Sequence, residues 1–119
     1  MLEYNNLPKA LDFHYVVAIY KIECTKNQKV YIGQTGNPRE RCKSHRRLLV
    51  SGKHYIPDMQ KDFIKFGEEC FTFEILEQTD DFRSRFPLER FFMELYKSYD
   101  REWGYNYRDR AFNWAKASM

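Results

Sequence analysis

Three segments of the chain have the residue pattern of β-strands. Residues 14–24 (HYVVAIYKIEC) and 29–33 (KVYIG) are rich in β-branched and aromatic residues, and residues 70–77 (CFTFEILE) alternate between apolar and polar positions. Both features are typical of strands. The polar segment between the first two strands predicts a hairpin with a two-residue loop at Lys26 and Asn27.

Three other segments have apolar residues at helical spacing. Asn37 is a good N-cap and Pro38 suits a first helical position, so a helix is expected over 38–50. Residues 57–67 (PDMQKDFIKFG) and 87–99 (PLERFFMELYKSY) predict two more helices. The apolar stripe expected to form the buried face of the last helix consists of Leu88, Phe91, Phe92, Leu95 and Tyr99.

The order of these elements, β-β-α-α-β-α, predicts the fold class. It is typical of an α+β domain in which helices flank a small three-stranded antiparallel sheet. At 119 residues, the chain 1–119 is expected to form a single domain. Its core is expected over residues 14–110, after an N-terminal extension at 1–13.

The hairpin fixes which side chains share a face of the sheet. A loop centred on Lys26 and Asn27 puts Tyr20 opposite Gly33 and Tyr31 opposite Ile22, so both tyrosines lie on one face. Gly33 beside Tyr20 is expected to leave room for a ligand or another backbone. Gly33 and Gly36 are also expected to turn the chain sharply toward the helix that follows.

Cysteine usage and hydropathy indicate the compartment. Cys24, Cys42 and Cys70 have neither metal-ligand nor disulfide spacing, and predict reduced thiols in an intracellular, cytoplasmic protein. The sequence shows no signal-peptide pattern, and no apolar run approaches the ~20 residues of a membrane helix. A membrane is therefore not an expected partner.

Charge is concentrated in one segment. Lys and Arg outnumber Asp and Glu by only 20 to 17. Residues 39–53, however, hold one Glu against six basic residues, which are Arg39, Arg41, Lys43, Arg46, Arg47 and Lys53. Such a cluster is typical of a surface that binds a polyanion such as duplex DNA, although a solvated helix face would look the same.

Two short segments of the predicted hairpin resemble a known motif. AIY at 18–20 is followed after ten residues by YIG at 31–33, and the pair resembles the GIY-YIG motif of a nuclease superfamily. Ala18 stands where the first glycine is usual. Arg41, His45, Glu89 and Asn106 follow in the family's order. The resemblance is closest to the catalytic domains of phage and intron-type homing endonucleases, which also carry a second histidine, like His54.

The resemblance implies roles for the two tyrosines and the basic residues. Tyr20 is implied as the base and Tyr31 as the residue that orients water or phosphate, with swapped or shared roles left open. A tyrosine near its reference pKa of ~10 is a poor base, so a nearby cation is needed. Arg41 and His45 share a helix face because they are four residues apart, and a guanidinium suits a phosphate. His45 could donate to a phosphate oxygen or to a tyrosine hydroxyl.

The resemblance also implies a metal ion. Glu89 is implied as the ligand of one divalent ion, Mg²⁺ or Mn²⁺; a single carboxylate suits Mg²⁺, which keeps several waters. A helix-stabilising acid is the alternative reading of Glu89. Asn106 is implied as a supporting residue with Gly33. His54 fits either a supporting role or an exposed loop position.

The function expected from these residues is metal-dependent DNA endonuclease activity. Water would attack the phosphodiester, with charge stabilised by the metal ion and Arg41. The residues expected to contact the DNA backbone are Arg39, Lys43, Arg46, Arg47 and Lys53. A single active site is expected to cleave one DNA strand in each binding event, so a homo-oligomer is a possible route to double-strand cleavage. The alternatives are a catalytically inactive DNA-binding module on the same fold and a protein-interaction domain.

Overall fold

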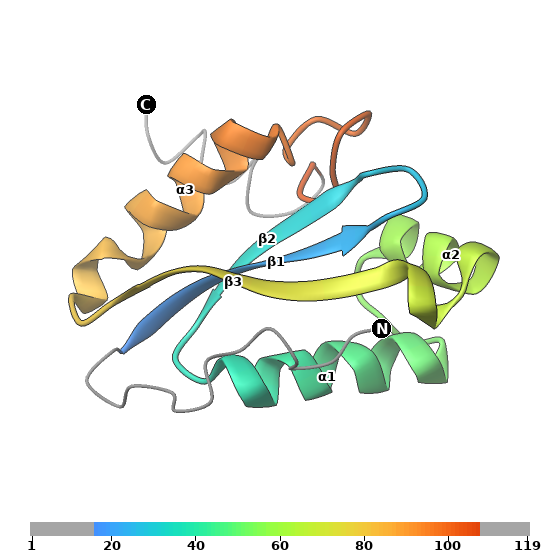
Figure 1. The fold of residues 1–119 in the computed structure, drawn as a ribbon, viewed down its shortest axis with the longest axis horizontal. Coiled ribbons are helices and arrows are strands. Elements are labelled where there is room, and N and C mark those ends of the chain that lie inside the picture. The colour runs from blue at the N-terminus through green and yellow to red at the C-terminus, as the bar shows by residue number, and fades with distance from the viewer. Residues whose placement is uncertain (1–15, 108–119) are drawn as a thin grey trace.

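The computed structural model describes residues 16–107. The predicted extension at 1–13, His14 and the end of the predicted core at 110 lie outside the described residues, so a single domain over 1–119 stays a prediction. The described elements are β1 (Val17–Cys24), β2 (Val30–Thr35), α1 (Pro38–Ser51), α2 (Pro57–Phe66), η2 (Glu68–Cys70), β3 (Phe71–Thr79), η3 (Phe82–Ser84) and α3 (Arg85–Tyr96) (Figure 1). The predicted order is confirmed, with two short 3₁₀ turns added.

The strands form one antiparallel sheet in the order β2-β1-β3, which confirms the predicted α+β class. Tyr20 lies opposite Gly33 and Ile22 opposite Tyr31, as predicted. The prediction of a two-residue loop is wrong. The last hydrogen bond of the hairpin before the loop runs from the N–H of Cys24 to the carbonyl of Lys29 over 3.0 Å, so the loop is longer. The longer loop has the same centre, so the register is unchanged.

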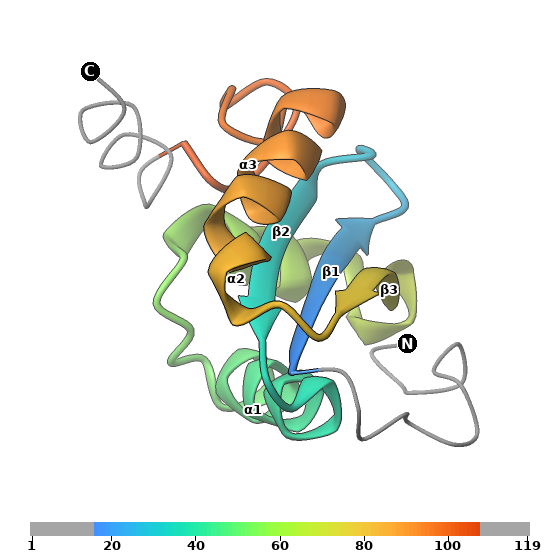
Figure 2. The same cartoon turned by 90° about the vertical axis from the view of Figure 1, so that its left-hand side faces the viewer.

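The helices cover the two faces of the sheet in separate layers. α1 and α2 lie on one side and α3 on the other, as the two perpendicular views show (Figures 1 and 2). The core between the sheet and α1 and α2 includes Tyr20, Ile22, Tyr31, Cys42, Leu49, Met59, Phe63, Phe71 and Phe73. The core under α3 consists of Val17, Ile19, Val30, Ile32 and Met93, with Leu88, Phe92 and Tyr96 packed at its rim. Among the residues described, no helix has the length and apolarity to cross a bilayer.

Local sequence sets both ends of α1. The Asn37 side chain accepts a hydrogen bond from the Glu40 N–H over 3.2 Å, and Pro38 occupies the first turn. Gly52 ends the helix in the left-handed region with φ 76°, where glycine has no steric penalty. The predicted bend at Gly33 is wrong, because β2 continues to Thr35 and the chain turns after it.

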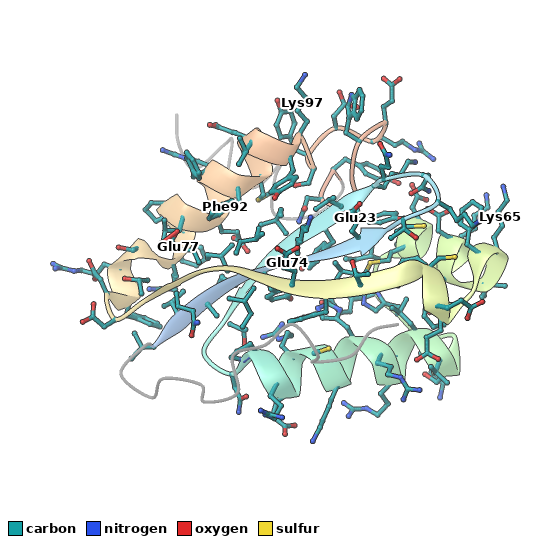
Figure 3. All side chains as sticks on the ribbon, viewed as in Figure 1. Glu23, Lys65, Glu74, Glu77, Phe92 and Lys97 are labelled. Atoms are coloured by element: carbon teal, nitrogen blue, oxygen red, sulfur yellow. The ribbon has the colours of Figure 1, made fainter. Side chains whose placement is uncertain are left out.

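The predicted buried face of α3 is right for Leu88 and Phe92, which pack against the core, and wrong for the other three residues. Phe91 and Leu95 are 56% and 61% exposed, and the helix ends at Tyr96 instead of continuing to 99. The residues buried on α3 are Glu89 and Met93, and Phe92 lies on the side toward the sheet (Figure 3). Apolar residues surround much of this helix, so their spacing alone did not indicate which side packs.

Candidate active site

Three aromatic side chains meet on the face of the sheet that α1 and α2 cover. The ring centroids of Tyr20 and Tyr31 are 6.2 Å apart, and His45 of α1 lies 5.7 Å from the first ring and 5.6 Å from the second. Tyr20 also stacks on Phe73 of β3 at 4.8 Å. All four side chains are buried. The hairpin and the first turns of α1 therefore bring together residues 25 positions apart in the chain.

Gly33 is required by the position of the Tyr20 ring. A Cβ atom at Gly33 would lie 2.4 Å from both Cζ and the hydroxyl oxygen of Tyr20, well inside van der Waals contact. The space above this glycine is therefore filled by the phenol itself, and the prediction of room for a ligand is wrong. The glycine allows the hydroxyl of Tyr20 to lie directly over β2.

A chain of hydrogen bonds runs from Tyr20 through two histidines to the backbone. The Tyr20 hydroxyl and Nε2 of His45 are 2.8 Å apart, and Nδ1 of His45 is 2.8 Å from Nε2 of His54. The backbone N–H of Ile56 donates to Nδ1 of His54 over 3.0 Å. The interpretation of His54 as an exposed loop residue is wrong, since its side chain is buried.

Burial keeps both histidines neutral. Desolvation, with smaller contributions from His54 and Arg41, lowers the pKa of His45 from its ordinary value of 6.5 to about 3. Desolvation lowers the pKa of His54 to about 4. At neutral pH each ring therefore has one N–H donor and one acceptor nitrogen, which is the condition for a directed chain.

Two residues around the histidines had no signal in the sequence. Gln60 of α2 is buried; its carbonyl accepts from the N–H of His54 over 2.9 Å, and its amide donates to the carbonyl of Leu49 over 3.0 Å. Tyr55 stacks on His54 with ring centroids 4.4 Å apart while its side chain stays exposed. A glutamine and a tyrosine in a polar segment are ordinary, so their place at the site depends on the tertiary fold.

Arg41 lies beside the site, whereas the other basic residues of α1 point elsewhere. Arg41 is exposed one turn before His45, and its charge contributes to the lowered pKa of that histidine. Arg39 and Lys43 are each two residues from Arg41, so they project about 160° away around the helix. The predicted basic surface is thus divided between two sides of α1.

The fold also adds an acid to the predicted basic cluster. Arg46 forms an ion pair with Glu68, which comes from η2 just before β3. The count of one acid against six basic residues holds within residues 39–53, but in the folded protein Glu68 is a second acid at this surface. Arg47 and Lys53 are exposed.

Asn106 supports β2 through its side-chain amide. Its oxygen accepts from the N–H of Ile32 over 2.9 Å, and its nitrogen donates to the carbonyl of the same residue over 3.0 Å. Asn106 is buried. It fixes the strand between Tyr31 and Gly33, so it acts on the site through the backbone.

Glu89 belongs to the other helix layer. It is buried on α3, one turn before Met93, which packs on the opposite face of the sheet from α1. Within residues 16–107, no three His, Cys, Asp or Glu side chains gather as a metal-binding group. A single buried carboxylate fits a hard ion that retains waters and shares substrate phosphate oxygens, so the donor set is compatible with Mg²⁺ or Mn²⁺.

Comparison with known proteins identifies this arrangement. The family model of the GIY-YIG catalytic domain matches residues 16–106, which confirms the resemblance seen in the residues. The solved structure of the catalytic domain of homing endonuclease I-TevI is similar with a TM-score of 0.67 and 30% identity, covering 75% of this chain and 95% of that chain. A glutamate-to-alanine mutant of the I-TevI catalytic domain is similar with a TM-score of 0.66 and 30% identity, covering 76% and 92%. No curated protein matches.

Proposed function

Since the chain belongs to the GIY-YIG nuclease family, we propose that it hydrolyses phosphodiester bonds of duplex DNA with Tyr20 as the base and a divalent metal ion at Glu89. The observation that carries the proposal is the hydrogen bond between the Tyr20 hydroxyl and Nε2 of His45, which are 2.8 Å apart beside Arg41. A buried tyrosine hydroxyl needs a hydrogen-bond partner in any case, and a buried neutral imidazole beside an arginine is a partner that can stabilise a phenolate. Ala18 does not weaken the proposal, because it lies in extended strand backbone and does not need a positive φ.

The proposed reaction is an attack by water on phosphorus. The Tyr20 phenolate takes a proton from the attacking water, the water oxygen forms a bond to phosphorus, and the bond to the leaving deoxyribose oxygen breaks. The leaving oxygen takes a proton from solvent. Arg41 pairs with the phosphate oxygens and stabilises the charge that builds on them. Because the Tyr20 side chain is fully buried, DNA binding has to admit the attacking water.

Tyr31 and Glu89 have supporting roles in this proposal. Tyr31 orients the water or the phosphate from the neighbouring strand. Glu89 would hold Mg²⁺ or Mn²⁺, which when bound supplies Lewis-acid stabilisation of phosphate charge. One carboxylate leaves the other positions of the ion to water and substrate.

Nicking of supercoiled plasmid tests the proposal. We expect conversion to open circles with Mg²⁺, none with EDTA, and a loss of ~10²-fold or more in Glu89→Gln. Glu94→Gln is the matched control, since Glu94 is exposed on the same helix. If folded Glu89→Gln protein cleaves at the wild-type rate, Glu89 is not the ligand of a catalytic metal ion. Linear product formed with second-order dependence on protein would support a homo-oligomer.

Salt dependence of DNA binding separates Arg41 from the other basic residues. Each phosphate contact that is removed should lower the slope of log affinity against log salt by about 0.9. We expect that change for Arg41→Ala, and a smaller one for Lys43→Ala, which projects away from the site. A catalytically inactive binding module would show the same salt slopes but no nicking with Mg²⁺ or Mn²⁺.

A further inference from the structure

The hydrogen bonds around His54 and His45 have a direction that a backbone amide decides. The N–H of Ile56 points at Nδ1 of His54, and an amide hydrogen cannot move to another atom. Nδ1 of a neutral His54 is therefore the acceptor, so its proton is on Nε2. That N–H donates to Nδ1 of His45, which puts the proton of His45 on Nε2, facing the Tyr20 hydroxyl.

We propose that the two histidines form a fixed donor chain, directed by the Ile56 amide and held by Gln60, which stabilises the phenolate of Tyr20 and cannot accept its proton. The proposal deepens the proposed function and rests on Tyr20 as the base. It assigns Gln60 as a positioning residue that acts through His54. It also excludes a proton relay in which Tyr20 passes its proton to His45.

The reverse direction would leave two donors facing each other. For Tyr20 to donate to His45, both histidines would need their protons on Nδ1, and Nδ1–H of His54 would then face the N–H of Ile56. A buried donor without an acceptor is unfavourable. A doubly protonated His45 meets the same conflict, because His54 already donates to its Nδ1. The described groups that surround this ring are Tyr20, Tyr31, His54, Tyr55 and Arg41, and none of them is an acid that would stabilise an imidazolium.

The donor chain determines where the Tyr20 proton goes. The Nε2–H of His45 uses one lone pair of the phenolic oxygen, so the phenolic hydrogen points away from His45. It leaves to water, and the phenolate that remains keeps the hydrogen bond from His45. When the phenolate takes a proton from the attacking water, the phenol is restored and neither histidine changes its protonation.

Gln60 sets the separation of the two histidines. Its carbonyl holds the backbone of His54, and its amide holds the carbonyl of Leu49, which lies one turn after His45 on α1. One side chain thus joins α2, the 52–56 loop and α1. Loss of this bridge would let the loop move away from α1 and lengthen the 2.8 Å contact between the imidazoles.

Nitrogen-15 NMR of the imidazoles tests the direction without any nuclease assay. The chain has three histidines, and His14→Gln identifies the third set of signals. At pH 7 we expect long-range ¹H–¹⁵N correlations of the neutral Nε2–H tautomer for both His45 and His54. An Nδ1–H tautomer at His45 would overturn the proposal. An inactive protein with the expected tautomers would instead reject the proposed function and leave the donor chain standing.

Gln60→Leu tests the positioning role, with Gln78→Leu on β3 as the matched control. We expect Gln60→Leu to give mixed tautomer signals for His45 and a single-turnover rate lower by up to ~10²-fold, the scale for a misplaced reacting group, with DNA affinity unchanged. A purely structural glutamine would lower the melting temperature and leave the tautomers of the folded protein unmixed, which would reject the role of Gln60. If Gln60→Leu does not fold, the wild-type spectrum still decides the direction of the chain.

Discussion

The two faces of the sheet are built from the same strands and held by different forces. On the α3 face, Val17, Ile19 and Ile32 are buried against Met93, and burial of apolar surface stabilises these contacts. On the α1 face, the alternate residues Tyr20 and Tyr31 meet His45 and a directed hydrogen-bond chain. Both faces contribute apolar burial, and the larger apolar cluster lies under α1 and α2. The α1 face adds the hydrogen-bond chain of the histidines, whereas Glu89, the proposed metal ligand, lies on α3. Substitutions in the histidine chain and in the apolar packing under α3 should therefore change different measured quantities.

The largest effect is expected at Tyr20. Tyr20→Phe keeps the ring and its stacking on Phe73 but removes the oxygen proposed to take a proton from water, so the single-turnover rate should fall by ~10²-fold or more. DNA affinity should stay near wild type. Tyr96→Phe, on the α3 face, is the control and should keep the wild-type rate. Equal rates for Tyr20→Phe and wild type would show that Tyr20 only packs.

Met93 should give the opposite result. Met93→Ala removes a buried side chain from the α3 face, so the free energy of unfolding should fall by about 2–5 kcal/mol, measured by urea denaturation. The single-turnover rate of the folded fraction should fall far less than in Tyr20→Phe, because the histidine chain lies on the other face and Glu89, one turn before Met93, is unchanged. A rate loss as large as that of Tyr20→Phe would mean that the packing under α3 also sets the active site.

The buried histidines should make the α1 face sensitive to acid. The unfolded chain takes up protons near pH 6.5, whereas folded His45 stays neutral down to about pH 3, so stability falls as pH is lowered from 6.5 toward 4. The slope is about 1.4 kcal/mol per pH unit for each proton bound only by the unfolded state, and His54 adds to it. Urea denaturation between pH 7 and pH 5 measures the slope, which His45→Gln should reduce. The same slope in both proteins would show that His45 is not held neutral.

The smallest effect is expected at Ser98, after α3. Its side chain is fully buried, and its hydroxyl has no hydrogen-bond partner among the described residues. Ser98→Ala removes this unsatisfied group, so the protein should be unchanged or more stable by up to about 1 kcal/mol, measured as a change in the urea midpoint. Loss of stability would indicate a partner for the hydroxyl.

Much of the fold could be predicted because its signals are local. Asn37, Pro38 and Gly52 set the ends of α1 through their own backbone preferences, and the strand register followed from the centre of the hairpin. The buried side of α3 was predicted only in part, since apolar residues surround most of the helix. Leu88 and Phe92 pack as expected, whereas Phe91 and Leu95 are exposed. A register shift between Ile19 and Tyr20 in the β1–β3 pairing also has no local signal.

Part of the arrangement of the candidate site was predicted together with its residues. The register of the hairpin placed Tyr20 and Tyr31 on one face of the sheet. The spacing of Arg41 and His45 on one helix was enough to place both on one side. The contacts of Gln60 join two neighbouring helices and the loop between them, and the ion pair between Arg46 and Glu68 joins residues 22 positions apart. Such contacts depend on how α1 and α2 pack, which the order of residues does not specify.

The hydrogen bonds made by Asn106 also bear on how copies of this protein avoid aggregation. An open sheet edge can pair with another chain. The outer side of β2 is closed at Val30 by the backbone of Trp103 and Tyr105, and at Ile32 by the Asn106 amide. The opposite outer strand, β3, carries the exposed acids Glu74 and Glu77 (Figure 3). One edge is thus protected by its own chain. The other carries charged side chains, namely Glu77 and the pair of Glu74 and Lys21 at 3.6 Å, and burying them against a second copy would be unfavourable.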